Sequence, residues 1–160
     1  MANIYKTRDK DAKVITQYVE SDQTTSSTTA KTISFNPDYI KGRLNEPYAI
    51  EGCIFLSASN ATNAGTIAFD AGSGSLSIEG TLSSAAANIT AGGVFALTTS
   101  TVTCELPSGS AVNAGACLLF KGTWIPTLRD GVSTVLTSSN AGTTFTVKQG
   151  SWIKFTRLSD

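Results

Sequence analysis

Carboxylates, thiols and hydroxyls are the groups with which this chain could do chemistry, because its 160 residues include no histidine. Without an imidazole, the Ser-His-Asp triad, the Cys-His dyad and the HExxH zinc site are all excluded. A Ser-Lys nucleophile would need a nearby lysine, and no lysine or arginine occurs between Arg43 and Lys121. We therefore expect a protein that is not an enzyme, with no catalytic, cofactor-binding or metal-ligating residues.

Two carboxylates, Asp70 and Glu79, flank the glycine-rich stretch Gly72-Ser73-Gly74 and come nearest to a catalytic pair. An acid–base pair must face one cleft, and a calcium site gathers several close-set oxygens. The spacing enforces neither arrangement, so we interpret both carboxylates as polar surface groups. The glycines lie between two strand-like runs, without the helix N-terminus that would bind a phosphate, and they predict a hairpin turn.

The three cysteines, Cys53, Cys104 and Cys117, lie far apart, each within an apolar segment. No CxxC pair occurs, and no histidine could complete a mixed metal site. A nucleophilic thiol would also lack its usual histidine base. We interpret all three as small buried apolar residues that stay reduced.

The charged residues are distributed unevenly, although the formal net charge is zero. A neutral chain has no global field that favours nucleic acid or an anionic membrane, and no apolar run approaches the about 20 residues of a membrane helix. From residue 52 to residue 120 the charged side chains are those of Asp70, Glu79 and Glu105 alone. A surface of Ser, Thr, Asn, Ala and Gly favours a protein that is packed against others in an assembly.

The chain divides into two regions at about residue 46. Residues 1–46 are polar, include a Ser/Thr-rich patch at 21–32, and end at the two X-Pro steps Asn36-Pro37 and Glu46-Pro47. The first residues, MANIYKTRDKDAK, lack the apolar segment and cleavage site of a secretory signal, so we expect synthesis in a cytoplasm. We expect residues 1–46 to be a polar, extended N-terminal arm and linker, and residues 47–160 to be the folded domain.

From residue 48 onward, short apolar runs alternate with turns of small residues. Apolar and polar residues alternate with a period of two in the runs 76–82, 101–106 and 145–148, as in half-buried strands. No segment combines the 3.6-residue apolar spacing of a helix with helix caps. About eight strands at intervals of about 10 residues predict an all-β fold, an antiparallel β-sandwich or jelly roll.

The triplet Asn-Ala-Gly opens three of these apolar runs, at Asn63, Asn113 and Asn140. A repeated ligand-binding element would explain the recurrence, but the spacings are unequal, unlike those of a regular repeat architecture. Asn and Gly tolerate left-handed backbone conformations, and the Asn side chain can bond its own backbone. We interpret the triplet as turn chemistry at the entrance to strands.

Two tryptophans are candidates for a binding function. Trp124 in GTWIP and Trp152 in GSWIKF both lie near predicted strand starts, where an exposed ring could stack on a sugar. Core packing or contact between subunits is the commoner role of tryptophan in a β-sandwich.

Together these features resemble the small virion proteins of tailed bacteriophages, and among them the capsid decoration (cement) proteins. The resemblance is one of overall style and rests on the segment MANIYKTRDKDAKVITQY, the Ser/Thr patch and the strands opened by Asn-Ala-Gly. It implies a non-enzymatic structural protein, often a homotrimer, that bridges major capsid proteins and stabilises the capsid. Its expected place is the outer surface of the capsid, after synthesis in the host cytoplasm.

The N-terminal arm is where we expect contact with the capsid or with a neighbouring subunit. Such an arm has too little apolar content to fold alone but can order on a partner. Its basic residues alternate with Asp9 and Asp11, which suits pairing with a surface of mixed charge. The candidate contact residues are Lys6, Arg8, Lys10, Lys13 and Tyr18. A solvated tail is the alternative interpretation.

Two other classes of virion protein stay open on the sequence. One is the receptor- or glycan-binding head of a fibre or spike, which exposed aromatic residues beside Asn or Asp would favour. The other is a tail, neck or connector component. The expected partners are the major capsid protein and further copies of this chain, with no nucleic acid and no membrane.

Overall fold

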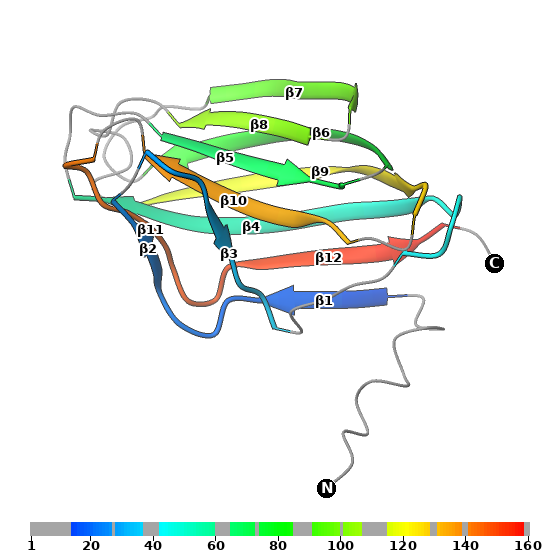
Figure 1. Cartoon of the computed structure of the whole chain (residues 1–160), viewed down its shortest axis with the longest axis horizontal. Coiled ribbons are helices and arrows are strands. Elements are labelled where there is room, and N and C mark those ends of the chain that lie inside the picture. The colour runs from blue at the N-terminus through cyan, green and yellow to red at the C-terminus, as the bar shows by residue number, and fades with distance from the viewer. Residues whose placement is uncertain are drawn as a thin grey trace, which may run out of the picture.

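The chain folds as a β-sandwich of two antiparallel sheets, shown by a computed structural model (Figure 1). The structure describes residues 14–26, 28–36, 42–59, 65–72, 74–84, 91–99, 101–106, 115–128, 131–138 and 141–158. Within these ranges the regular elements are strands throughout. The predicted all-β class and the antiparallel sandwich are confirmed.

The large sheet has eight strands. Six of them follow one another in space in the order β1 (Val14–Tyr18), β12 (Trp152–Arg157), β4 (Tyr48–Ala58), β9 (Ala116–Pro126), β6 (Gly74–Ser84) and β7 (Ala91–Thr99). The two others are short, β2 (Gln23–Thr25) and β11 (Phe145–Val147), and β11 pairs with both β2 and β4. The long strands β4, β9 and β6 therefore form the centre of this sheet.

The small sheet has four strands and packs over one side of the large sheet (Figure 1). In spatial order its strands are β3 (Lys31–Ile33), β10 (Ser133–Ser138), β5 (Gly65–Asp70) and β8 (Thr101–Leu106). The run 76–82 alternates in burial as well, since Leu76, Ile78 and Leu82 of β6 are buried. The run at 145–147 does not, because all three residues of β11 are buried. The predicted strands thus place their apolar residues in the space between the two sheets.

The N-terminal segment contributes more to the sandwich than the expected division at residue 46 allows. Strand β1 pairs with β12, β2 pairs with β11, and β3 pairs with β10. The physical reason is that alternate residues of the segment point inward, so that Ile15, Gln17 and Val19 are buried, as is Ile33. The expectation of an extended arm is thereby restricted to residues 1–13, which lie outside the described residues.

Aromatic side chains form the centre of the core. The ring of Trp124, on β9, is fully buried and lies 5.2 Å from the ring of Tyr48 and 5.8 Å from that of Phe155. Phe120, also on β9, lies 4.6 Å from Phe69 of the small sheet. The strand β9 therefore joins its own sheet to the opposite one through Phe120, while Trp124 packs against rings of its own sheet.

Two glycines allow the central strands to pack around these rings. A Cβ atom at Gly52 of β4 would lie 2.5 Å from Cζ of Phe120, so the ring occupies the space that a side chain would take. A Cβ atom at Gly122 of β9 would lie 2.0 Å from the carbonyl oxygen of Ser77 on β6. The close approach of β9 to its neighbours therefore depends on the absence of both side chains.

The glycines of the Asn-Ala-Gly triplets lie at strand entrances, as predicted. Gly65 begins β5, Gly115 precedes β9 with a φ of 96°, and Gly142 lies in the turn before β11. The asparagines of the three triplets lie outside the described residues.

The predicted hairpin at Gly72-Ser73-Gly74 is wrong, although a turn does occur there. Gly72 has a φ of 63°, and its N–H donates to Oδ1 of Asp70 at 2.8 Å. The strands on either side do not pair, because β5 belongs to the small sheet and β6 to the large one. A period of two in the sequence identifies a strand but not the strands beside it in a sheet. The connection from β5 to β6 crosses from the small sheet to the large one.

Substitution Gly122→Ala should destabilise the sandwich strongly, because the new Cβ atom would collide with the backbone of β6 and push β9 away from it. We expect a loss of about 3 kcal/mol in the free energy of unfolding, measured by urea denaturation. Gly115→Ala is the matched control, since a Cβ atom there meets nothing within 4 Å and only the positive φ opposes it. Its cost should be about 1 kcal/mol. Equal losses for the two variants would contradict the steric explanation.

Candidate functional site

The outer face of the large sheet, the side turned away from the small sheet, carries exposed apolar side chains. On β4 the even-numbered residues from Tyr48 to Ala58 are buried, so the odd-numbered ones point outward. The antiparallel register then aligns outward residues of neighbouring strands into rows that run across the sheet. Two of these rows differ sharply in chemistry.

The first row is apolar and contains two aromatic residues. Tyr18 of β1 lies opposite Trp152 of β12, Trp152 lies opposite Cys53 of β4, and Cys53 lies opposite Leu119 of β9. Phe55 is the next outward residue along β4. The exposed fractions of Tyr18, Phe55 and Leu119 are 46%, 41% and 52%, and Trp152 is half-buried. We call Tyr18, Trp152, Phe55 and Leu119 the aromatic patch.

A turn at residues 148–151 interrupts the edge of the sheet beside Phe55. The N–H of Phe55 donates to Oγ of Ser151 at 2.9 Å, and its carbonyl accepts from the N–H of Lys148 at 2.8 Å. Strands β11 and β12 pair with β4 on either side of this turn. Such an interruption bends a strand and redirects a side chain, and here it accompanies an exposed phenyl ring.

Asp22 joins the N-terminal segment to this turn. Its Oδ1 accepts from the N–H of Gln149 at 2.9 Å, and its Oδ2 lies 2.8 Å from Nζ of Lys148. The hydrogen bond from Lys148, followed by that from Gln149, lowers the pKa of Asp22 below its ordinary value. The ionised carboxylate therefore ties the connection between β1 and β2 to the turn beside the aromatic patch.

A disulfide lies within the aromatic patch. Cys53 of β4 and Cys117 of β9 form it, with their Cα atoms 6.4 Å apart. The prediction of three reduced thiols is wrong for these two residues, because the antiparallel pairing brings two outward cysteines from positions 64 residues apart onto the same face. Cys104 is a buried thiol, as expected.

The second row is a ladder of alternating charges. Lys154 of β12 lies opposite Glu51 of β4, Glu51 opposite Lys121 of β9, and Lys121 opposite Glu79 of β6. Two ion pairs form along it, Lys154 to Glu51 at 2.6 Å and Lys121 to Glu79 at 2.9 Å. We call these four residues the charge ladder. Its charges sum to zero, and their order across the sheet is plus, minus, plus, minus.

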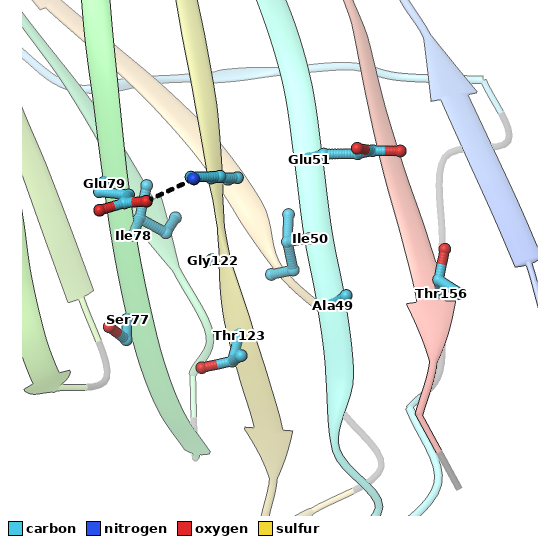
Figure 2. A pocket seen from close by; sticks show the side chains of 10 residues that line it. Ala49, Ile50, Glu51, Ser77, Ile78, Glu79, Gly122, Thr123 and Thr156 are labelled. Carbon is cyan, nitrogen blue, oxygen red and sulfur yellow. Dashed lines mark ion pairs between the residues drawn. The ribbon is translucent and has the colours of Figure 1, made fainter.

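An open hollow of about 570 Å³ lies beside the ladder. In Figure 2, Glu79 and Glu51 lie along one level of the sheet, and Ser77, Thr123, Ala49 and Thr156 form the next level. These next residues are small because their side chains are hydroxyls or a methyl group, so the surface dips there. The hollow is a shallow part of the sheet face, with charged groups on one border and hydroxyls on the other.

The outer face of the small sheet has a different chemistry. Thr32, Val135, Ala68 and Thr103 lie opposite one another in one row, and Ser133, Asp70 and Thr101 form another. Asp70 is the charged residue of these two rows, and its Oδ1 accepts from Oγ1 of Thr101 at 3.4 Å. These two rows are therefore nearly uncharged and rich in threonine, as the composition of the middle of the chain predicts.

Of the candidate contact residues, the structure describes Tyr18 alone. It lies exposed on β1, in the aromatic patch, with its ring beside Trp152 in the cross-strand register. Lys6, Arg8, Lys10 and Lys13 lie outside the described residues. Their predicted contacts stay predictions.

The two tryptophans have different surroundings. Trp124 is fully buried in the core, which excludes it from stacking on a ligand. Trp152 is half-buried on the outer face of the large sheet, so part of its side chain is accessible to a partner.

The carboxylates considered as a catalytic pair do not meet. Glu79 lies on the outer face of the large sheet, paired with Lys121, whereas Asp70 lies on the small sheet. Within the described ranges, no group of three His, Cys, Asp or Glu side chains could hold a metal ion. None of the described segments is a helix with the length and apolar character needed to cross a membrane.

Sequence reasoning singled out Tyr18 and Trp152 of the aromatic patch, but it missed Phe55, Leu119 and the charge ladder. The alternation Glu51, Cys53, Phe55 places three residues on one face, and Trp152 and Lys154 alternate in the same way. This signal was visible in the sequence. Their alignment into rows required the strand order β12-β4-β9-β6, which the sequence does not state.

No family model matches the chain, and no curated protein matches it by sequence. Among solved structures, the Eiger TNF of S. frugiperda is similar at 11% identity and a TM-score of 0.43, over 93% of this chain and 95% of that one. The N-terminal modules of endo-1,4-β-D-xylanase 10B from Clostridium thermocellum, complexed with xylohexaose, are 11% identical with a TM-score of 0.33, over 93% of this chain and 29% of that one. The VP2 protein in the subviral particle of infectious bursal disease virus is 12% identical with a TM-score of 0.26, over 89% of this chain and 39% of that one. Similarities this weak carry no argument about what this chain does.

Removing the disulfide should destabilise the fold, because a cross-link between residues this far apart restricts the unfolded chain. For the variant Cys53→Ala/Cys117→Ala we expect a loss of about 2–4 kcal/mol in the free energy of unfolding. Urea denaturation with and without a reductant measures it. The reductant should lower the midpoint of the parent protein and leave that of the variant unchanged. An unchanged midpoint for the parent would show that the disulfide does not contribute.

Stability should also depend on the ionisation of Asp22. A folded-state pKa below the ordinary value of 3.8 means that this contribution is present above pH 3.8 and disappears as the pH falls through the lowered pKa. The variant Asp22→Asn should therefore have a lower melting temperature than the parent at pH 7, and this gap between the two melting temperatures should disappear at strongly acidic pH. Lys148→Met should have a smaller effect at pH 7, because the bond from Gln149 remains. A gap that is the same at both pH values would refute the assignment.

Proposed function

We propose that this chain is a non-enzymatic structural protein of a virus particle, which decorates a phage capsid and stabilises it by bridging major capsid proteins. In this proposal the protein is made in the host cytoplasm and acts on the outer surface of the capsid. Its partners are the major capsid protein and other copies of itself, with no nucleic acid and no membrane involved.

The observation that carries the proposal is the aromatic patch on a broad sheet face. Trp152, Tyr18 and Phe55 lie together there, and Leu119 continues the patch onto β9. Clustered aromatic residues on an open surface are typical of protein–protein contacts, where Trp and Tyr supply much of the binding energy. Small-molecule sites are instead concave and enclosed. A broad contact surface suits a protein that assembles with others.

The disulfide supports a final location outside the reducing cytoplasm. Disulfides persist in oxidising surroundings, including the surfaces of virions and cells, and are rare in cytosolic proteins. Cys53 and Cys117 bridge two central strands on an outer face. A protein that is made in a cytoplasm and then released with a particle would form this bond after release.

Self-association is part of the proposal, and the resemblance to decoration proteins implies a homotrimer. The broad sheet faces would offer flat contacts between copies. Many weak contacts in one assembly raise the effective concentration of each partner, so that individually weak contacts are enough.

Glycan binding is a second candidate, and Trp152 favours it. A half-exposed indole with Tyr18 beside it on a flat sheet could stack on a sugar ring. A glycan array distinguishes the two functions, because binding that is lost in Trp152→Ala would favour the head of a fibre or spike. Particle imaging distinguishes a decoration protein from a tail or neck component.

Deletion of residues 1–13 should weaken attachment to capsids while leaving the sandwich folded, because β1 begins at Val14. Raised salt should weaken attachment of the intact protein as well, since exposed charge pairs are screened over about 8–10 Å. Single reversals at Lys6 or Arg8 should have little effect, because one exposed pair contributes at most about 1 kcal/mol. Co-sedimentation with assembled capsids measures both effects.

The matched control is deletion of residues 1–18, which also removes β1. It should lower the stability of the sandwich, because Ile15 leaves the core and the edge of β12 is uncovered. If the protein without residues 1–13 decorates capsids as well as the whole chain, these residues are not the anchor. If the intact chain does not bind capsids at all, the proposed function fails.

A further inference from the structure

We propose that two copies of this chain pair face to face through the outer faces of their large sheets. The two-fold axis would lie in the interface, parallel to the strands and midway between β4 and β9. The contact joins the charge ladder of one copy to the ladder of the other, and Phe55 and Leu119 of each copy to the disulfide of its partner. This inference rests on the self-association in the proposed function, and it assigns that self-association a two-fold axis in place of the three-fold axis of a homotrimer.

The order of charges in the ladder carries the argument. A two-fold axis parallel to the strands reverses the order of the strands across the interface, so that β4 of one copy faces β9 of the other. Each row of outward residues still faces the same row of the partner. Lys154 of one copy then faces Glu79 of the other, and Glu51 faces Lys121. The plus, minus, plus, minus order is thus self-complementary, and every charge in the ladder meets an opposite one across the interface.

The same charges disfavour the other face-to-face arrangement. A two-fold axis along the ladder, perpendicular to the strands, would place each ladder residue over its own copy. Lys121 would then face Lys121 and Glu51 would face Glu51, and like charges in direct opposition are unfavourable. The ladder therefore selects one of the two possible axes.

The apolar groups fit the same axis. Leu119 of one copy faces Cys53 of the other, and Phe55 faces Cys117. Each disulfide would be covered by an exposed leucine and an exposed phenyl ring of its partner. The exposed apolar surface at the centre of the sheet would leave water, which drives association.

The neighbouring row lets the sheets approach each other. Ala49 would face Thr123, and Thr156 would face Ser77, so small side chains meet small side chains. Sheets that pack face to face lie about 10 Å apart, with strand directions within about 30° of each other.

Charge exchange between two variants tests this pairing on the pure protein. Glu51→Lys puts a positive charge opposite Lys121, and Lys121→Glu puts a negative charge opposite Glu51. The axis repeats the contact, so each single substitution creates two like-charge contacts. We expect each variant alone to show a dissociation constant raised at least about tenfold over that of the parent dimer.

A mixture of Glu51→Lys with Lys121→Glu should associate as a one-to-one pair with an affinity close to that of the parent. In that pair, each substituted residue faces an opposite charge in the partner copy. Mixing does not change either chain, so it could not repair a loss of folding or stability within one chain. Association restored in the mixture must therefore come from the contact between the two variants. Sedimentation of parent, single variants and mixture gives the four values, and circular dichroism confirms that each variant is folded.

Thr103→Lys is the matched control, because it changes charge at an exposed position on the outer face of the small sheet. It should leave the parent mass unchanged. The pairing is refuted if the parent is a monomer at tens of micromolar, or if it is a trimer, because a two-fold contact joins copies in pairs. A mixture that associates no better than its components also refutes it. Capsids are absent from the measurement, so failure here is distinct from failure of capsid attachment.

Discussion

Phe120 occupies the position on which the packing of the sandwich depends. Its ring lies 4.6 Å from Phe69 and so bridges the two sheets, and it can do so because the neighbouring strand has a glycine opposite it. A Cβ atom at Gly52 would lie 2.5 Å from the ring. A large ring on β9 and a missing side chain on β4 are complementary, so this contact selects the pairing of the two central strands.

The outer surface follows from this inner contact. Successive side chains of a strand point to opposite faces, so a ring at position 120 that points inward forces Leu119 and Lys121 outward. A slip of one residue would move the aromatic patch into the core and expose the core residues. The register that buries Phe120 also aligns Glu51 with Lys121 in the charge ladder. Core packing and the candidate contact surface are therefore two consequences of one register.

Two further interactions hold this surface in shape. The disulfide joins β4 to β9 within the aromatic patch, and Asp22 fastens the 148–151 turn beside Phe55. A surface that is already ordered loses less conformational entropy when it binds, which favours assembly. Such restraint suits a protein whose proposed role is to stiffen a larger structure through repeated contacts, because a flexible face would transmit little of that stiffness.

The sequence by itself determined the strand class and, in strands such as β6, which residues are buried, because a period of two is a local property of consecutive residues. Leu76, Ile78 and Leu82 are an example. It also indicated a weakly charged surface. The tertiary structure decided which strands are neighbours, and with them the disulfide between Cys53 and Cys117, the crossing at Gly72 and the ladder. These features join residues far apart in the chain, and no local pattern encodes the packing that brings such residues together.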